Sequence, residues 1–441
     1  MWLISTVDLS LVFHYECPEM QYAILSHTWE EDEVSFQDFK DLASARLKKG
    51  FSKIYWTVYL ARQRGLKWAW VDTCCIDKSS SAELSEAINS MYRWYQKSAI
   101  CYAFLSDLPS NGEQRLEDFQ KCRWWTRGWT LQELIAPGEV NFYDQNWGYY
   151  GKRTDLQEKI KSFTGISLIA YQGRLNDLSV AQRMSWVSRR TTARTEDMAY
   201  CLLGLFDVNM PMIYGEGDKA FIRLQEEICK NSSDPTIFAW TIQPSLRTYK
   251  ESQKHYGLLA SHPAEFAGCA NIFHNFTTQW SDVNYNISIG GSREIIFDRL
   301  SLRIDEDYGL LVHIGLAEST EFGTFRIFVP VKKTIGHHVR SFPDRLIGIP
   351  EEGQPIPPGP EIDEPFLKIS VIKDYEFSHA RLLYISRSAV SCPKRLTYDD
   401  SVRIDELHEQ ALLIKVDPNM QISAAYPENF WIPDKRAFLG T

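Results

Sequence analysis

The sequence predicts an α/β fold for roughly the first third of the chain, a parallel sheet with helices on both faces. Short apolar runs without polar alternation predict strands covered on both faces, and segments with helical spacing separate these runs. Polar residues gather where the runs end. Beyond the sheet we expect a helical connector and then a β-rich, sandwich-like domain, so that the expected domains are residues 1–150, 151–238 and 239–441.

Four apolar runs predict the strands of the first domain: Tyr22–Ser26, Trp68–Asp72, Ile100–Ser106 and Val140–Tyr143. Between the first two runs, residues 52–65 have helical spacing, and Gly65 stands where a helix C-cap is expected. A second helix is expected after Ser80, which forms a capping box with Glu83. Because strand and helix alternate, we expect parallel strands joined by right-handed crossovers.

The stretch from 125 to 138 has both ends of a short helix. Thr126 is a candidate N-cap, and Pro137 with Gly138 ends the helix. The expected buried stripe consists of Leu131, Leu134 and Ile135. Trp129 and Glu133 fall together on the other side of the helical wheel. A large aromatic ring beside a carboxylate, away from the core, indicates the wall of a cleft; the alternative is a solvated Glu beside a packed Trp.

Polar residues follow three of the predicted strands, at the ends where open α/β sheets bind ligands. They are Ser26, His27 and Trp29 after the first strand, Asp72 and Asp77 after the second, and Ser106 and Asp107 after the third. Glu133 can face the same crevice. Each residue alone also fits an ordinary role, such as a loop histidine or a cap, so it is their convergence that predicts a site. Cys74 and Cys75 are interpreted as buried packing, because no basic partner for a nucleophile is evident.

The later part of the chain carries two further patterns. A helix with a core stripe of Met198, Leu202 and Leu205 is expected in the connector. From about residue 240 alternating strands are expected at Glu294–Phe297, Leu300–Ile304, Leu310–Ile314, Phe325–Val329, Leu367–Val371 and Leu412–Val416. Several short strands of this kind favour a β-sandwich.

Composition excludes several classes of protein. The 441 residues contain 48 Lys and Arg against 57 Asp and Glu, a net charge of -9, and no long basic run, so nucleic acid is not expected as a partner. No apolar run reaches about 18 residues and no signal peptide is evident, so we expect no membrane span and a cytoplasmic location. The nine Cys form no CxxC pair, which indicates reduced thiols and no metal site.

Three motifs, in this order, resemble the hallmark blocks of the fungal heterokaryon-incompatibility (HET) domain. They are Tyr-Ala-Ile-Leu-Ser-His-Thr-Trp at 22–29, Trp-Val-Asp-Thr-Cys-Cys-Ile-Asp-Lys at 70–78, and Arg-Gly-Trp-Thr-Leu-Gln-Glu-Leu-Ile-Ala-Pro at 127–137. The run 194–206, with 214–217, resembles what commonly follows that domain. The resemblance implies a role in non-self recognition, programmed cell death and innate immunity, with an incompatibility partner or sensor protein.

A more remote resemblance bears on the chemistry. The order of strands and helices, followed by Trp-Thr-Leu-Gln-Glu-Leu at 129–134, is similar to the flavodoxin-like TIR domain. Many TIR domains hydrolyse NAD, and the Glu of their Trp-Cys-Leu-x-Glu-Leu block is catalytic. The matching residue is Glu133, Trp129 matches the Trp, and Thr130 replaces the Cys. The resemblance therefore implies NAD as a substrate and Glu133 as the catalytic residue.

The chemistry of NAD cleavage agrees with these residue types. Breaking the bond from nicotinamide to ribose builds positive charge on the ribose, which a nearby carboxylate stabilises. Nicotinamide leaves as a neutral base, so neither a metal nor a strong general acid is needed. Trp129 offers a flat face for a nicotinamide or adenine ring. The other candidates for substrate binding are Ser26, His27, Trp29 and Asp72.

Two functions from different classes follow from the sequence. In the first, the N-terminal domain is an NAD glycohydrolase that kills the cell by depleting NAD and needs no separate cofactor. The β-rich domain would then be a sensor or restraint, and a homo-oligomer is a candidate active form. In the second, it is a non-catalytic death-signalling adaptor whose cleft docks another protein. The carboxylate opposite the core stripe favours the first, because a docking surface does not need one there.

Overall fold

The computed structural model describes residues 1–110, 116–242 and 257–274, and beyond them 285–290, 293–297, 302–305, 309–319, 323–334, 337–340, 344–350, 361–364, 367–371, 412–415, 431–432 and 437–440. The chain forms two compact units. The first contains Met1–Leu178, Ser185–Ile228 and Ser261–Pro263, and the second contains Ser179–Met184, Cys229–Ala260 and Ala264–Thr441. The three-part division expected from the sequence stays a prediction.

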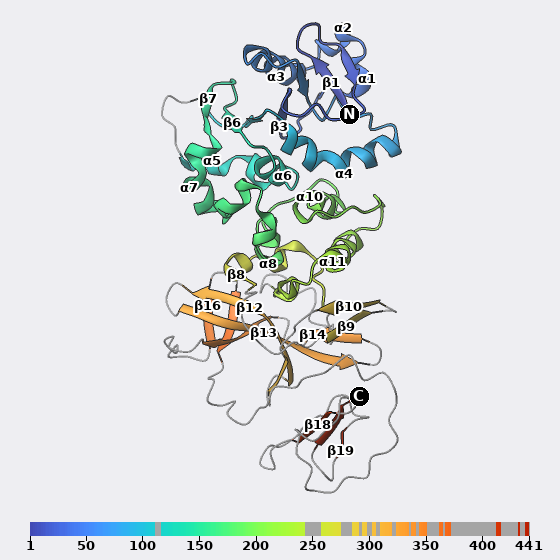
Figure 1. Cartoon of the computed structure of the whole chain (residues 1–441). Coiled ribbons are helices and arrows are strands. Elements are labelled where there is room, and N and C mark those ends of the chain that lie inside the picture. The colour runs from blue at the N-terminus through green and yellow to red at the C-terminus, as the bar shows by residue number, and fades with distance from the viewer. Residues whose placement is uncertain are drawn as a thin grey trace. The chain divides into compact units, whose positions relative to one another are not determined.

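A seven-stranded mixed sheet lies at the centre of the first unit (Figure 1), with the strand order β2-β1-β4-β3-β5-β6-β7. The inner strands, which are all parallel, are β4 (Trp68–Trp70), β3 (Tyr22–His27), β5 (Ile100–Phe104) and β6 (Val140–Tyr143). The outer strands are β1 (Trp2–Ser5), β2 (Leu11–Phe13) and β7 (Tyr149–Lys152). The four predicted strands are confirmed, but the purely parallel sheet is wrong because these outer strands pair antiparallel.

The inner strands follow the chain order 2-1-3-4, as in doubly wound flavodoxin-like sheets. All six residues of β3 are buried, which explains its lack of polar alternation. Helix α3 (Phe51–Gln63) leads from β3 to β4, and α4 (Ser81–Lys97) leads from β4 past β3 to β5. These crossovers run in opposite directions, so right-handed connections place the two helices on opposite faces of the sheet (Figure 1).

The predicted ends of these two helices are largely confirmed. Gly65 has a φ of 71° directly after the C-cap of α3, a left-handed conformation that favours glycine. At the start of α4, the Ser80 side chain accepts a hydrogen bond from the backbone N–H of Glu83. The Glu83 carboxylate accepts from the backbone N–H of Asp77 (2.9 Å), so only half of the expected capping box forms.

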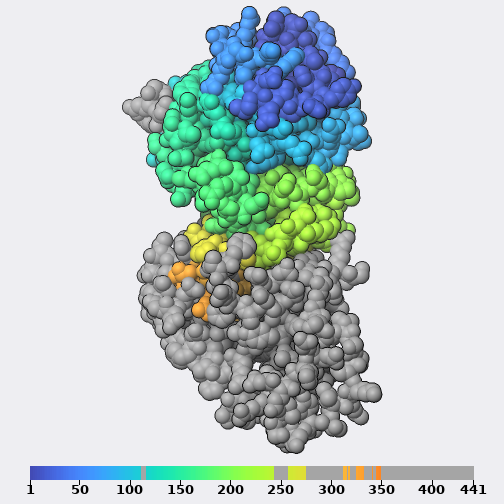
Figure 2. Space-filling view, viewed as in Figure 1, coloured from blue at the N-terminus to red at the C-terminus, as the bar shows by residue number. Residues whose placement is uncertain are grey.

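Shorter helices complete the first unit. They are α1 (Phe36–Phe39), α2 (Leu42–Ala45), α5 (Leu116–Lys121), the 3₁₀ helix η1 (Arg123–Thr126), α6 (Thr130–Ile135), α7 (Arg153–Thr164), α9 (Asp197–Tyr200) and α10 (Leu203–Phe206), and α11 (Lys219–Asn231) begins here. The single helix expected around residues 198–205 is therefore two short helices. Helix α10 packs on α4, and Figure 2 shows the sky-blue surface of α4 beside the yellow-green surface of the later segment.

The second unit is built mainly from strands. Its largest sheet contains β8 (Ile272–Phe273), β11 (Leu302–Asp305), β12 (Gly309–Ser319), β13 (Gly323–Thr334), β14 (His337–Arg340), β15 (Leu346–Pro350), β16 (Glu361–Glu364) and β17 (Leu367–Val371). Smaller sheets contain β9 (Tyr285–Gly290) with β10 (Arg293–Phe297), and β18 (Leu412–Lys415) with β19 (Trp431–Ile432) and β20 (Ala437–Gly440). The expected strands are confirmed within the described residues, whereas Leu300, Ser301 and Val416 lie outside them. A sandwich arrangement stays a prediction.

Candidate functional site

The candidate site lies where the central strand β3 ends. Ser26 and His27 are its last two residues and pair with Ala103 and Phe104 of β5. The order of the parallel strands reverses between β3 and β5, because β4 lies on the other side of β3. In doubly wound sheets, this switch point is where the carboxyl ends of the strands leave room for a ligand.

Helix α6 corrects two expectations from the sequence. It begins at Thr130, not near Thr126, because Thr126 ends η1 and its hydroxyl donates to the Arg123 carbonyl (2.9 Å). All six residues of α6 are buried, and Glu133 is only 7% exposed. The buried stripe of Leu131, Leu134 and Ile135 is confirmed. The other side of the helix is buried as well. The prediction that Glu133 lies away from the core was therefore wrong.

A distant segment of the chain covers the start of α6. The buried Arg190 donates from Nη1 to the Arg127 carbonyl (2.8 Å) and to Thr130 Oγ1 (2.9 Å). The backbone N–H of Gly128 donates to the Thr191 carbonyl (2.9 Å). A Cβ at Gly128 would lie 2.5 Å from the Thr192 methyl group, so this close approach requires glycine.

The other end of α6 is held by Arg153, a buried residue at the start of α7. Its guanidinium donates to the carbonyl of Leu134, and from Nη2 to the carbonyl of Gly138 (3.0 Å). These bonds satisfy carbonyl groups that lack a partner at a helix end. Arg153 and Arg190 thus fix both ends of the helix that carries Glu133.

Glu133 reaches from α6 to the end of β3. The Ser26 hydroxyl donates a hydrogen bond to Glu133 Oε2. Burial raises the pKa of Glu133 to about 8; the bond from Ser26 opposes this shift, and the negative charge of Asp72 adds to it. At pH 7 the carboxyl group is therefore mostly protonated in the ligand-free protein. The structure brings Ser26 and Glu133 together, as the sequence predicted, but in a buried environment that raises the pKa of the acid.

The raised pKa gives the first testable prediction. The unfolded chain ionises Glu133 near its ordinary value of 4.5, whereas the folded protein ionises it near 8. Between these values the unfolded state binds fewer protons, so the stability of the wild type falls as pH rises. Glu133→Gln removes this titration and should gain roughly 4 kcal/mol of stability relative to the wild type from about pH 5 to about pH 8. Chemical denaturation across this range measures it.

The matched control for this titration is Glu139→Gln. The hydrogen-bonded ion pair with Arg64 (2.8 Å) lowers the pKa of Glu139. A carboxyl group whose folded pKa is lowered stabilises the fold above its unfolded pKa, so the Glu139 variant should lose relative stability as pH rises to about 5 and then keep a constant difference from the wild type up to about pH 8. If the stabilities of Glu133→Gln and of the wild type change in parallel with pH, burial does not raise the pKa of Glu133.

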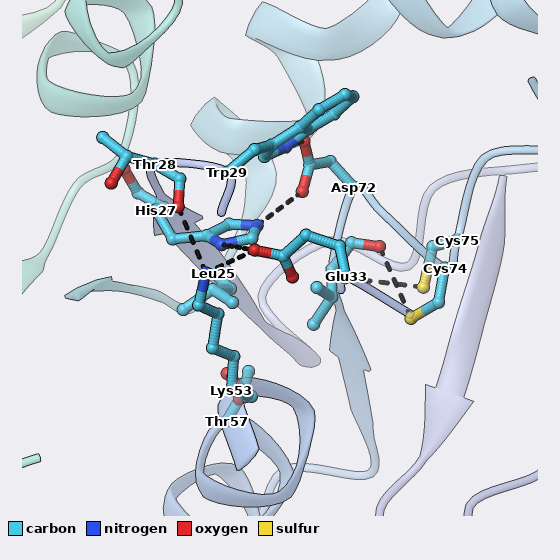
Figure 3. A network of polar contacts seen from close by, with 12 residues as sticks. Leu25, His27, Thr28, Trp29, Glu33, Lys53, Thr57, Asp72, Cys74 and Cys75 are labelled. Atoms are coloured by element: carbon cyan, nitrogen blue, oxygen red, sulfur yellow. Dashed lines mark hydrogen bonds and ion pairs between the residues drawn. The ribbon is translucent and has the colours of Figure 1, made fainter. Parts of the chain in front are cut away.

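Asp72 connects the ends of β3 and β4 (Figure 3). Its carboxylate accepts from Trp29 Nε1 (2.7 Å) and lies 2.9 Å from His27 Nε2. Burial acts to raise its pKa, but His27, Lys78 and Trp29 outweigh burial and lower the pKa to about 2, so Asp72 is ionised at pH 7. Trp29 is 49% exposed, and Lys78 Nζ lies 3.6 Å from the centroid of its ring. The structure thus joins His27, Trp29 and Asp72 in one polar network.

Lys53 is a member of this network that the sequence did not indicate. It extends from α3 with 4% of its surface exposed, and its ammonium donates to the Thr28 carbonyl (3.1 Å) and pairs with Glu33 (Figure 3). Glu33 Oε1 in turn lies 3.9 Å from His27 Nδ1. The available signal was a lysine on the apolar face of α3, directly before the buried Ile54.

Trp129 lies half-buried at the N-cap of α6. Burial raises the pKa of Asp197, and Tyr214 and Trp129 oppose this shift. The Asp197 carboxylate accepts from the Tyr214 hydroxyl (3.0 Å). The sequence did not indicate Trp124, although it lies three residues before the start of the third motif. Its indole N–H donates to Ser26 Oγ (2.8 Å).

Other residue types give no second site in the described part of the chain. Cys74 and Cys75 are buried as expected, and burial raises the pKa of the Cys74 thiol well above its usual range. Among the described residues, no three His, Cys, Asp or Glu side chains are placed to hold a metal ion. No helix of the described segments has the length and apolar character needed to cross a membrane.

Residues 22–117 match the family model described as "Heterokaryon incompatibility protein (HET)", so the chain contains a fungal heterokaryon-incompatibility domain, as its motifs indicated. Over 220 residues the chain is 51% identical to the vegetative incompatibility protein HET-E-1 of Podospora anserina. That match covers 48% of this chain and 16% of the relative, so the chain spans only a small part of the relative's length. No solved structure gave a significant match.

Proposed function

We propose that this chain is a cell-death effector of fungal non-self recognition and that its HET domain hydrolyses NAD to nicotinamide and ADP-ribose products. The role in incompatibility rests on the family match and on the relative described as a vegetative incompatibility protein. The enzymatic part rests on one observation: a carboxyl group, Glu133, is hydrogen-bonded to Ser26 at the switch point of a doubly wound sheet. We also infer that the parallel strands have a TIR-like arrangement.

The ionisation of Glu133 is central to this proposal. NAD carries a positive charge on the nicotinamide ring, and a positive charge close to a carboxyl group favours its ionised form. Substrate binding would therefore deprotonate Glu133 and produce the carboxylate when it is needed. The glycosidic bond then breaks with its electron pair on the ring nitrogen, water forms the new bond to the ribose carbon, and one proton leaves to solvent. The carboxylate stabilises the positive charge on the ribose during this step.

The neighbouring network supplies groups for the rest of the dinucleotide. The exposed ring of Trp29 is available for stacking on a base, and Trp129 offers a second ring. Asp72 is ionised and accepts hydrogen bonds, which suits sugar hydroxyls, and His27 is its partner. Lys78 adds a positive charge beside Trp29, and a positive charge suits a diphosphate.

The cellular setting of the proposal follows from the substrate and the family. NAD is present in the cytoplasm, where we place the protein. An incompatibility partner or sensor would release the activity, with the β-rich second unit as sensor or restraint and a homo-oligomer as the active form. These assignments concern regulation and leave the chemistry at Glu133 unchanged.

One observation favours a second function. Glu133 is almost completely buried and mostly protonated at pH 7, which also suits a structural hydrogen bond inside a non-catalytic adaptor. In that case the end of the sheet would dock a death-signalling protein.

Measurement of NAD in cells separates the two functions. Cells induced to express the full chain should lose NAD before they lose viability, because depletion causes death. Cells expressing Glu139→Gln, a surface carboxylate change, should behave identically. Death with a constant NAD level would support the adaptor and reject the enzyme.

A further inference from the structure

A buried chain of hydrogen bonds ends on Glu133. Trp124 and Ser26 are both inaccessible to solvent. The Trp124 indole N–H donates to Ser26 Oγ (2.8 Å), and the Ser26 hydroxyl donates to Glu133 Oε2. An indole has one donor and no acceptor, so the Ser26 oxygen must be the acceptor in the first bond. The single hydroxyl proton of Ser26 is then directed to Glu133.

We propose that Ser26 is a positioning residue that holds a hydrogen-bond donor against the Glu133 carboxylate, with its orientation set by Trp124. This role differs from the substrate contact expected from the sequence, and it rests on the proposed function of Glu133 as the reacting carboxylate. Glu133 is only 7% exposed, so water offers few donors to replace this hydroxyl, and the hydroxyl of Ser26 stabilises the ionised acid.

Other ionisable groups act on Glu133 from the surrounding elements. They are Asp72 after β4, Tyr95 on α4, Cys101 on β5, Arg127 before α6 and Arg190 from the covering segment. Asp72 disfavours the carboxylate and Arg127 favours it. Ser26 is neutral at all accessible pH values, so its removal changes the ionisation of Glu133 without adding a second titration.

Ser26→Ala is the primary test. Loss of a hydrogen bond to a charged group should raise the pH midpoint of Glu133 ionisation by about one unit. The pH profile of kcat/KM for NAD cleavage, which reports the free enzyme, should shift upward by the same amount, so that the rate near pH 7 falls about tenfold. Ser26→Thr keeps a hydroxyl and should restore the wild-type midpoint.

Trp124→Phe provides a second variant with a closely matched control. It removes the indole N–H that orients Ser26 and should shift the midpoint in the same direction by a smaller amount. Trp125→Phe is the control, because the adjacent and also buried Trp125 donates to the Phe119 carbonyl (2.7 Å) and not to Ser26. Both variants lose an indole from the same short helix, so a general loss of packing affects them alike.

A readout independent of activity separates this inference from the proposed function. The difference in stability between each variant and its Glu133→Gln derivative, followed against pH, reports the midpoint of Glu133. A raised midpoint without any nicotinamide release supports the role of Ser26 and rejects NAD cleavage. Normal turnover with an unchanged midpoint in Ser26→Ala overturns the inference and leaves the proposed function standing. An equal shift in Trp124→Phe and Trp125→Phe overturns the orienting role of Trp124.

Discussion

Glu133→Gln is expected to lower the rate of NAD cleavage about a hundredfold or more and to abolish cell killing, while the protein stays folded. The reason is that an amide cannot supply the negative charge that stabilises the ribose in the transition state, and loss of such a group costs at least this much. Nicotinamide release by the purified variant and viability of expressing cells measure the two effects. Circular dichroism and a melting curve establish that the variant is folded.

Gln is the informative replacement because Glu133 is buried and mostly protonated at pH 7. The amide has nearly the same shape and keeps an acceptor for the Ser26 hydroxyl. Glu133→Ala would leave a cavity and remove that acceptor, at a cost of about 1–3 kcal/mol. Leu134→Ala is the control for general damage, since truncating this buried core residue should cost roughly 2–5 kcal/mol. A Gln variant that stays folded and cleaves NAD at the wild-type rate would show that Glu133 is structural.

Gly204→Ala should be among the most destabilising single substitutions in the first unit. A Cβ at this position of α10 would lie 2.0 Å from Tyr92 Cβ on α4 and 2.3 Å from Tyr92 Cγ. Tyr92 Cβ is fixed by the backbone and no side-chain rotation moves it, so the two helices must separate. Overpacking of this kind should cost about 3 kcal/mol, which exceeds the gain of about 1 kcal/mol from replacing a helical glycine by alanine.

Gly138→Ala is the matched control for Gly204→Ala. Open space surrounds the position that its Cβ would occupy, so its stability should stay within about 0.5 kcal/mol of the wild type. Thermal and urea unfolding of both variants provide the comparison. If Gly204→Ala is as stable as Gly138→Ala, the close packing of α10 on α4 is not maintained in solution.

The sequence was sufficient for the strands that carry strong local signals. The strands β3, β4, β5 and β6 are mostly apolar and buried because helices cover them on both faces, and their apolar runs show this directly. The outer strands β2 and β7 were missed because they are short and partly exposed, so their residues lack such a run. The antiparallel edges of the sheet therefore became visible only in the structure.

The composition of the candidate site was predicted better than its environment. Strand ends gather at one edge of a parallel sheet, which is why Ser26, Asp72 and Glu133 could be grouped from their positions alone. A helical wheel assumes that one side of a helix meets solvent. Helix α6 is instead covered by a segment about 60 residues later in the chain, where Arg190 bonds to Arg127 and Thr130. Contacts between such distant residues leave no periodic signal, so the burial of Glu133 could not be foreseen.

The most direct test of the account is nicotinamide release from NAD by the full chain purified from cells that it is killing. The assay is run near pH 8, where Glu133 is about half ionised even without substrate. We predict that nicotinamide accumulates in proportion to enzyme concentration, together with an equal amount of ADP-ribose products, and that Glu133→Gln protein gives only the background rate. Intact NAD after incubation with wild-type protein from dying cells would contradict the account.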